Sequence, residues 1–222
     1  SHMYVFHPEI LKEYIWPLLA GLKMTVIVSV LSMFLGMIAG LIACMMKISP
    51  NVFLRVSGTI YIEIARGIPN MVAIFWLYYS LPIITGITFS AFTSGVAALS
   101  LKYGGYIAEI YRAGIEAIKI GQKEAAYSIG FSKFQTMSRI VIPQAFRIAI
   151  PDLGNVFVGL LQNSALLSVI GVADLMRNAE LAVSETWRPF EIYTAAAVLY
   201  LTLTIIFARS AGYFENRIAI VR

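Results

Sequence analysis

The sequence predicts an all-α integral membrane protein with about five transmembrane helices and a short cytoplasmic helix between spans three and four. Hydrophobic residues make up 59% of the 222 residues and charged residues only 13%, whereas a soluble domain carries about a quarter charged residues. The apolar residues gather in stretches of about 20, the length that a helix needs to cross a bilayer. We therefore expect a single transmembrane domain over residues 4–222, after a tag scar and initiator, Ser-His-Met, at residues 1–3.

The expected elements follow the apolar stretches in chain order. A short interfacial helix is predicted over residues 4–17. The five spans are predicted over residues 24–46, 57–79, 89–111, 153–173 and 192–208. In the second span, Gly67 and Pro69 weaken the helix, and backbone groups freed at such a break are tolerated in a membrane where they face a cavity. The spacing of Gly36 and Gly40 in the first span indicates a close helix contact.

Lysine and arginine predict the orientation, because cytoplasmic loops carry an excess of these residues. They gather after span one, between spans three and four, and in the C-terminal tail: Lys47, Arg55, Arg112, Lys119, Lys123, Lys133, Arg139, Arg147, Arg209, Arg217 and Arg222. On the other side, acidic residues partly offset a smaller set: Lys12, Lys23, Lys102, Arg177 and Arg188. We therefore expect the N-terminus outside and the C-terminus in the cytoplasm. The net charge of +5 follows from this bias, and nucleic-acid binding is disfavoured because the basic residues flank spans.

Several kinds of chemistry lack their residues in this sequence. No Gly-x-x-x-x-Gly-Lys-Ser/Thr stretch occurs, so the chain does not bind ATP by a P-loop. The single cysteine, Cys44, lies in the first span, and the one native histidine, His7, precedes it. These residues cannot form a disulfide or a cysteine and histidine metal cluster within one chain. We expect neither a metal site nor a cofactor in this chain.

The segment over about residues 119–143 has the signals of two short cytoplasmic helices. A helix is predicted over residues 123–129, ended by Gly130 in the left-handed conformation. Ser132 and Gln135 have the spacing of a capping box that starts a second helix, and Pro143 is predicted to end it. The low-relief surface of the first helix would let another protein approach closely. An amphipathic helix lying on the lipid surface is the alternative.

Residues Gly121-Gln-Lys-Glu-Ala-Ala-Tyr-Ser-Ile-Gly130 and Ile140-Val-Ile-Pro143 resemble the EAA loop of ABC importer permeases. Four further stretches resemble the polar amino-acid uptake permeases: Ile64-Ala-Arg-Gly-Ile-Pro69, Tyr106-Ile-Ala-Glu-Ile-Tyr-Arg-Ala-Gly114, Pro143-Gln-Ala-Phe-Arg147 and Ser168-Val-Ile-Gly171. The resemblance covers roughly residues 20–215. In that family the EAA segment forms a coupling helix that sits in a groove of a cytoplasmic ATPase. The resemblance therefore implies that four residues couple to the ATPase: Glu124, Ala125, Ala126 and Gly130.

The resemblance also implies a set of partners. They are two cytoplasmic ATPase subunits, a second permease chain (the same chain or a close homologue), an external substrate-binding protein, an amino-acid substrate and membrane lipid. ATP and Mg²⁺ would be bound by the ATPase, so this multi-pass subunit of a prokaryotic cell membrane would not itself be an enzyme. A stand-alone channel or secondary carrier remains the alternative. A carrier needs an ion-coupling site and usually more spans, often as repeated halves, and this sequence shows no internal repeat.

Polar residues inside predicted spans are costly in lipid and are therefore candidates for substrate contact. Two rows have helical spacing, one in the second span and one at the start of the fourth: Glu63, Arg66 and Asn70, and Asp152, Asn155, Gly159 and Gln162. Two alternatives stay open. Glu63 and Arg66 would pair only with each other, or the second row would pack between subunits. Glu109 and Arg112, near a membrane edge, are interpreted as structural.

The residues of these rows favour a basic substrate. Where family members commonly carry a lysine, this sequence has Gln162, in the run Gln-Asn-Ser-Ala-Leu. The row therefore offers acceptors and no cation, while Arg66 can bind a carboxylate with a fork of donors. Glu63 and Asp152 together exceed what one α-amino group requires. We expect arginine, lysine or histidine as the substrate, with glutamine as the alternative.

Overall fold

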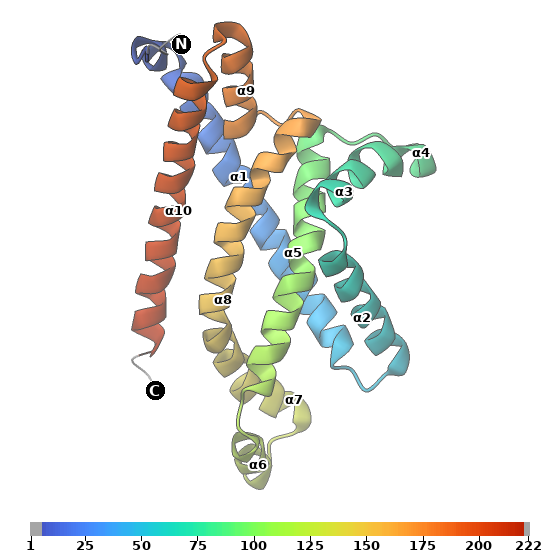
Figure 1. Ribbon diagram of the computed structural model, residues 1–222. Coiled ribbons are helices and arrows are strands. Elements are labelled where there is room, and N and C mark those ends of the chain that lie inside the picture. The colour runs from blue at the N-terminus through green and yellow to red at the C-terminus, as the bar shows by residue number, and fades with distance from the viewer. Residues whose placement is uncertain (1–5, 220–222) are drawn as a thin grey trace. The chain divides into compact units, whose positions relative to one another are not determined.

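The computed structural model describes residues 6–219, with side chains up to residue 213, and within this part every regular element is helical (Figure 1). The predicted tag scar at residues 1–3 lies outside the described residues. In chain order the elements are α1 (Glu9–Lys47), α2 (Val52–Gly67), α3 (Asn70–Phe75), the π-helical turn η1 (Trp76–Ser80), α4 (Leu81–Thr85), α5 (Ala91–Glu116), α6 (Ile120–Ser128), α7 (Lys133–Thr136), the π-helical turn η2 (Met137–Val141), α8 (Ile142–Asn163), the 3₁₀ helix η3 (Ser164–Ile170), α9 (Leu175–Thr186) and α10 (Pro189–Ala219). The predicted all-α class is confirmed.

Three helical runs among the described residues are long and apolar enough to cross a membrane. They are Glu9–Lys47, Lys133–Ile170 and Pro189–Tyr213. A fourth results if Val52–Gly67 and Asn70–Thr85 are counted together as one broken span. The expected count of five spans stays a prediction. The break itself is confirmed, because α2 ends at Gly67 and α3 begins after Pro69.

The predicted interfacial helix over residues 4–17 is wrong as a separate element, and its first two residues lie outside the described part. Helix α1 begins at Glu9 and continues through Pro17 to Lys47. Tertiary packing explains why the proline does not end it. Leu18 is buried in an apolar cluster with residues of α9 and α10, and Asn178 donates a hydrogen bond to the carbonyl of Pro17 at 2.7 Å. Helix α9, which holds this contact, was not predicted.

The expectation that Pro143 ends a helix is also wrong. The π-helical turn η2 leads directly into α8, in which Pro143 is the second residue. A π turn shifts the hydrogen bonds to wider spacing, so the missing N–H of a proline can be accommodated without ending the helix. As a result α7, η2 and α8 form one continuous run, and the fourth predicted span starts earlier than expected.

The chain forms two compact units, each described by itself. Unit 1 comprises the residues up to Ser32, Pro69–Leu99 and Val158–Phe207, and its core gathers α9 and α10 around Leu18. Unit 2 comprises Met33–Ile68, Ser100–Phe157 and the residues from Ala208. Its cores lie around Cys44 and Ile107.

Within unit 2, α1 and α5 touch where the sequence predicted a close helix contact. A Cβ added to Gly40 would lie 2.8 Å from Cγ2 of Ile107, and one added to Gly36 would lie 3.3 Å from the carbonyl of Ser100. Both distances leave little or no room for a side chain larger than hydrogen. The predicted close helix contact at these glycines is confirmed.

Candidate functional site

In unit 1, two of the predicted site residues, Asn70 and Gly159, are connected by the side chain of Asn163, which was not predicted as a site residue. Asn70 donates to Oδ1 of Asn163 at 2.6 Å, and Asn163 donates to the carbonyl of Gly159 at 2.8 Å. The structure therefore joins Asn70 to Gly159 by way of Asn163. The spacing of Asn163, four residues after Gly159, could have identified it, since such residues face the same side of a helix.

The polar row on α8 is accessible. The side chains of Asp152, Asn155 and Gln162 are all exposed in the isolated chain. A charged or amide side chain exposed on an apolar helix is available either to a substrate or to a second subunit. Both possibilities that the sequence left open for this row, contact with the substrate and packing between subunits, are compatible with its exposure.

The charged residues at the end of α2 do not pair with each other. Within the described residues no ion pair joins Glu63 to Arg66, and both side chains are exposed. The guanidinium of Arg66 instead lies 5.6 Å from the ring centroid of Tyr106, a cation–π distance. The interpretation in which Glu63 and Arg66 contact only each other is wrong in this structure, and the donors of Arg66 remain accessible.

Lys102 is the unexpected charge of unit 2. It was expected among the basic residues on the external side, but it lies inside α5 with only 7% of its surface exposed. Its ammonium donates to the carbonyl of Ala65 at 3.1 Å and to the carbonyl of Ile68. It also lies 5.8 Å from the ring of Tyr106. The sequence carries no signal for this placement, because Lys102 belongs to α5 and its acceptors belong to a segment more than 30 residues earlier in the chain.

Glu109 and Arg112 have the structural role that was expected. Glu109 accepts from Nζ of Lys47 at 2.5 Å and from Arg112 at 2.8 Å and 3.0 Å, while Arg112 also reaches Glu116 at 2.6 Å. This network fastens the end of α1 to α5 within unit 2.

The α6–α7 segment has the predicted local geometry. Gly130 adopts φ +88°, and the N–H groups of Gly130 and Phe131 donate to the carbonyls of Tyr127 and Ala126, both at 3.0 Å, which is a Schellman C-cap. The capping box is present, with Gln135 N–H donating to Ser132 Oγ at 3.2 Å and Ser132 N–H donating to Gln135 Oε1 at 2.9 Å. Helix α6 begins three residues earlier than predicted.

The α6–α7 segment also exposes large apolar side chains. Four large apolar side chains are exposed there: Ile120, Tyr127, Ile129 and Phe134. Of the four residues assigned to coupling, Glu124, Ala125 and Gly130 are exposed, while Ala126 is buried. Exposed apolar side chains of this kind are available for a contact with another protein.

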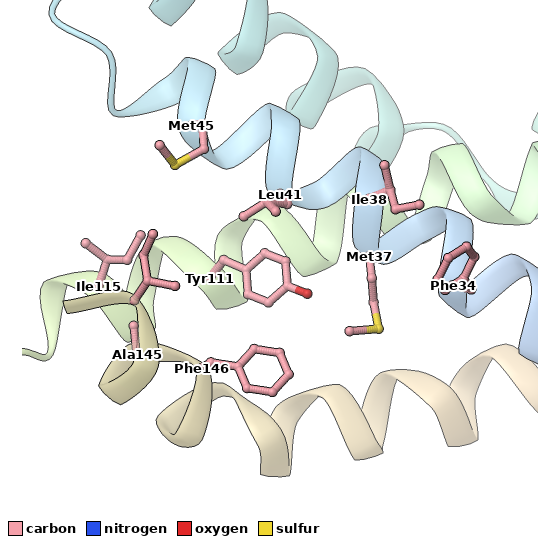
Figure 2. Close-up of a pocket in the computed structure, with 10 residues that line it drawn as sticks. Phe34, Met37, Ile38, Leu41, Met45, Tyr111, Ile115, Ala145 and Phe146 are labelled. Atoms are coloured by element: carbon pink, nitrogen blue, oxygen red, sulfur yellow. The ribbon is translucent and has the colours of Figure 1, made fainter. Parts of the chain in front are cut away.

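An apolar cavity of about 310 Å³ in unit 2 is not a candidate for a polar substrate (Figure 2). Side chains from α1, α5 and α8 line it, among them Phe34, Met37, Tyr111 and Phe146. Figure 2 shows these side chains around the opening, with the Tyr111 hydroxyl as the only oxygen drawn among the labelled sticks. Such a lining offers no partners for the charged ends of an amino acid.

Among the described side chains outside the candidate spans, Asp174 is the most deeply buried acid. It caps α9, where its Oδ1 accepts the N–H of Arg177 at 2.9 Å, and its Oδ2 accepts the hydroxyl of Tyr200 at 3.3 Å. Burial raises the pKa of Asp174 to about 7 from its ordinary value of 3.8, against the lowering effect of these hydrogen bonds.

This shift predicts a falling stability with rising pH. Between about pH 4 and 7 the folded chain holds a proton that the unfolded chain has lost, so the free energy of unfolding decreases through this window. Asp174→Asn keeps a cap oxygen and stays neutral. Relative to wild type it should gain on the order of 2–4 kcal/mol from pH 4 to pH 8. Thermal unfolding of the purified chain in detergent at a series of pH values measures this, and parallel profiles for the two proteins would contradict it.

Comparison with known proteins identifies the family of this chain. Residues 32–220 match the family described as binding-protein-dependent transport system inner membrane component. The chain is 38% identical over 198 residues to the probable glutamine ABC transporter permease protein GlnM of Bacillus subtilis strain 168, covering 89% of this chain and 91% of that protein. It is 33% identical over 220 residues to the putative glutamine transport system permease protein GlnP of Rickettsia typhi, covering 99% of each. A crystal structure of an amino acid ABC transporter with histidines has 38% identity and a TM-score of 0.90, covering 97% of this chain and 100% of that one.

Proposed function

Because this chain belongs to the family of binding-protein-dependent transport system inner membrane components, we propose that it forms the translocation pathway of an ATP-driven amino-acid importer. The match over nearly the whole chain carries this proposal, since it includes both the α6–α7 segment and the polar row of α8. The subunit spans the cell membrane with its N-terminus outside and its C-terminus in the cytoplasm. Its role is to transport the amino acid, whereas a separate ATPase subunit binds ATP and Mg²⁺.

The assembly that we propose contains two permease chains, two cytoplasmic ATPase subunits and an external substrate-binding protein. The exposed apolar side chains of this segment support the ATPase contact, because Ile129 and Phe134 are exposed in the same segment as the coupling residues Ala125 and Gly130. Seated in a groove of the ATPase, these helices would transmit its closure to the spans.

The substrate class that we propose is the basic amino acids. Arg66 has accessible donors for the substrate carboxylate, and its contact with Tyr106 does not occupy them. The exposed acids Glu63 and Asp152 offer one more negative charge than an α-ammonium needs. The solved amino-acid transporter with histidines, similar to this chain, agrees with a basic substrate.

Glutamine is the second candidate. Relatives of this chain carry glutamine permease names, and the amide side chains of Asn155 and Gln162 could hydrogen-bond a substrate amide. The two candidates differ in the need for an anionic side chain opposite the substrate, and the role of Asp152 therefore distinguishes them.

Reconstitution tests the proposed function. The ATPase and binding protein are identified by pull-down with this chain from its native membrane, and the complex is then placed in liposomes. We expect uptake of labelled amino acid that requires all three components and hydrolysable ATP. A non-hydrolysable ATP analogue is the control. Uptake by the permease chain alone, without ATP, would instead indicate a channel or secondary carrier.

A further inference from the structure

The last turn of α2 lacks a hydrogen-bond donor that a regular helix would have. The carbonyl of Ile64 accepts the N–H of Ile68 at 3.1 Å, as in any α-helix. The next carbonyl, that of Ala65, has no donor from the helix, because the chain turns to extended backbone at Ile68 (ψ 133°) and the following Pro69 has no N–H. An unpaired carbonyl inside a membrane costs several kcal/mol.

Lys102 supplies the missing donor. Its ammonium reaches the carbonyls of both Ala65 and Ile68, two of the acceptors at the break. A cation at the C-terminal end of a helix is also favoured by the helix dipole. With 7% of its surface exposed, Lys102 has little contact with solvent, and these carbonyls replace its water shell.

The face of α5 is shaped for this contact. Lys102, Gly105 and Tyr106 lie three and four residues apart and so share one side of the helix. A Cβ added to Gly105 would lie 2.6 Å from Cβ of Ala65, so the glycine permits α5 to approach the end of α2. The Tyr106 ring then lies within 6 Å of the ammonium of Lys102 and the guanidinium of Arg66.

We propose that Lys102 is a positioning residue, which supplies the donor for the carbonyls of Ala65 and Ile68 and thereby fixes the last turn of α2 with Arg66 pointed at the substrate carboxylate. The role of Arg66 rests on the proposed function, whereas the donor role of Lys102 does not. Without Lys102 the last turn would fray, and Arg66 would have to be ordered each time a substrate binds.

Substitutions of Lys102 test the donor role. Lys102→Met keeps the length of the side chain and removes its donors, and we expect it to lower the unfolding midpoint of the purified chain by about 3–6 °C. Lys102→Arg keeps a cationic donor, so it should cost less than half as much. Lys23→Met, which removes one exposed charge, is the control and should leave the midpoint unchanged. An equal loss from Lys102→Met and Lys102→Arg would overturn the proposal, whether or not the chain transports.

Transport kinetics test the positioning of Arg66. In the reconstituted importer Lys102→Met should raise KM for the amino acid about tenfold and change the maximal rate less than about threefold, because Lys102 does not touch the substrate. Lys102→Arg keeps a cationic donor and should recover most of the affinity. An unchanged KM, with the stability result intact, would overturn the positioning role alone.

Discussion

Replacing Gly130 or Ala125 by tryptophan should lower uptake and transport-stimulated ATP hydrolysis together, while the chain still inserts and folds. Both positions are exposed, and a Cβ on Gly130 meets no atom within 4 Å, so neither side chain clashes within the chain. The bulk would instead obstruct the groove of the ATPase, where close packing leaves no room for an indole. We expect both rates to fall at least about tenfold, equivalent to about 1.4 kcal/mol. Uptake and hydrolysis assays on the same liposomes measure this.

Two variants separate obstruction from local strain. Gly130 has φ +88°, which favours glycine, and asparagine tolerates this conformation better than other residues. Gly130→Asn should therefore retain much of the activity. Val52→Trp adds the same bulk at an exposed position on the same predicted side of the membrane, outside α6 and α7, and should transport normally. If the indoles at Ala125 and Gly130 leave uptake and hydrolysis coupled, the assignment of this segment is wrong.

Neutralising Asp152 should weaken uptake of basic amino acids more than uptake of glutamine. A lost charge-assisted hydrogen bond costs about 1.5–3 kcal/mol, or roughly tenfold to a hundredfold in affinity. Asp152 is exposed on the polar row of α8, so Asp152→Asn removes a charge without opening a cavity. Competition by unlabelled amino acids in vesicles with the whole importer measures the change in preference.

Asp152→Glu keeps the charge and is the matched control, for which we expect the wild-type order of preference. If Asp152 packs between subunits instead, Asp152→Asn should reduce the amount of assembled complex and leave the selectivity of the remainder unaltered. Preferred uptake of glutamate, or arginine uptake that Asp152→Asn does not change, would contradict the basic class.

The sequence predicted well wherever the signal was local. The left-handed Gly130, the capping box of Ser132 and the break beside Pro69 each depend on a few neighbouring residues, and all three are present. It failed where tertiary contacts outweigh local preference. Pro17 was expected to end a helix, yet packing of Leu18 carries α1 through it, and the π turn before Pro143 has the same effect there.

The candidate site shows the same division. Periodicity placed Asp152, Asn155 and Gln162 on one helix, and they are exposed on α8. It could not identify Asn163 as the partner of Asn70, since the two residues lie 93 positions apart. Nor could it place Lys102, because its acceptors are backbone carbonyls, that of Ala65 in α2 and that of Ile68 just after it, and every residue type has such a carbonyl.

The π-helical turn between α7 and α8 has a mechanical consequence. With a hinge at Pro143, a displacement of the α6–α7 segment would be absorbed by bending before it reached the polar row. The continuous run from Lys133 instead behaves as a stiff rod. From Thr136 to Asp152 it extends about 24 Å at the rise of an α-helix. A tilt imposed at the α7 end of this run would therefore swing the carboxylate of Asp152 sideways, so that, in the importer that we propose, the coupling segment and this acid would move as one body.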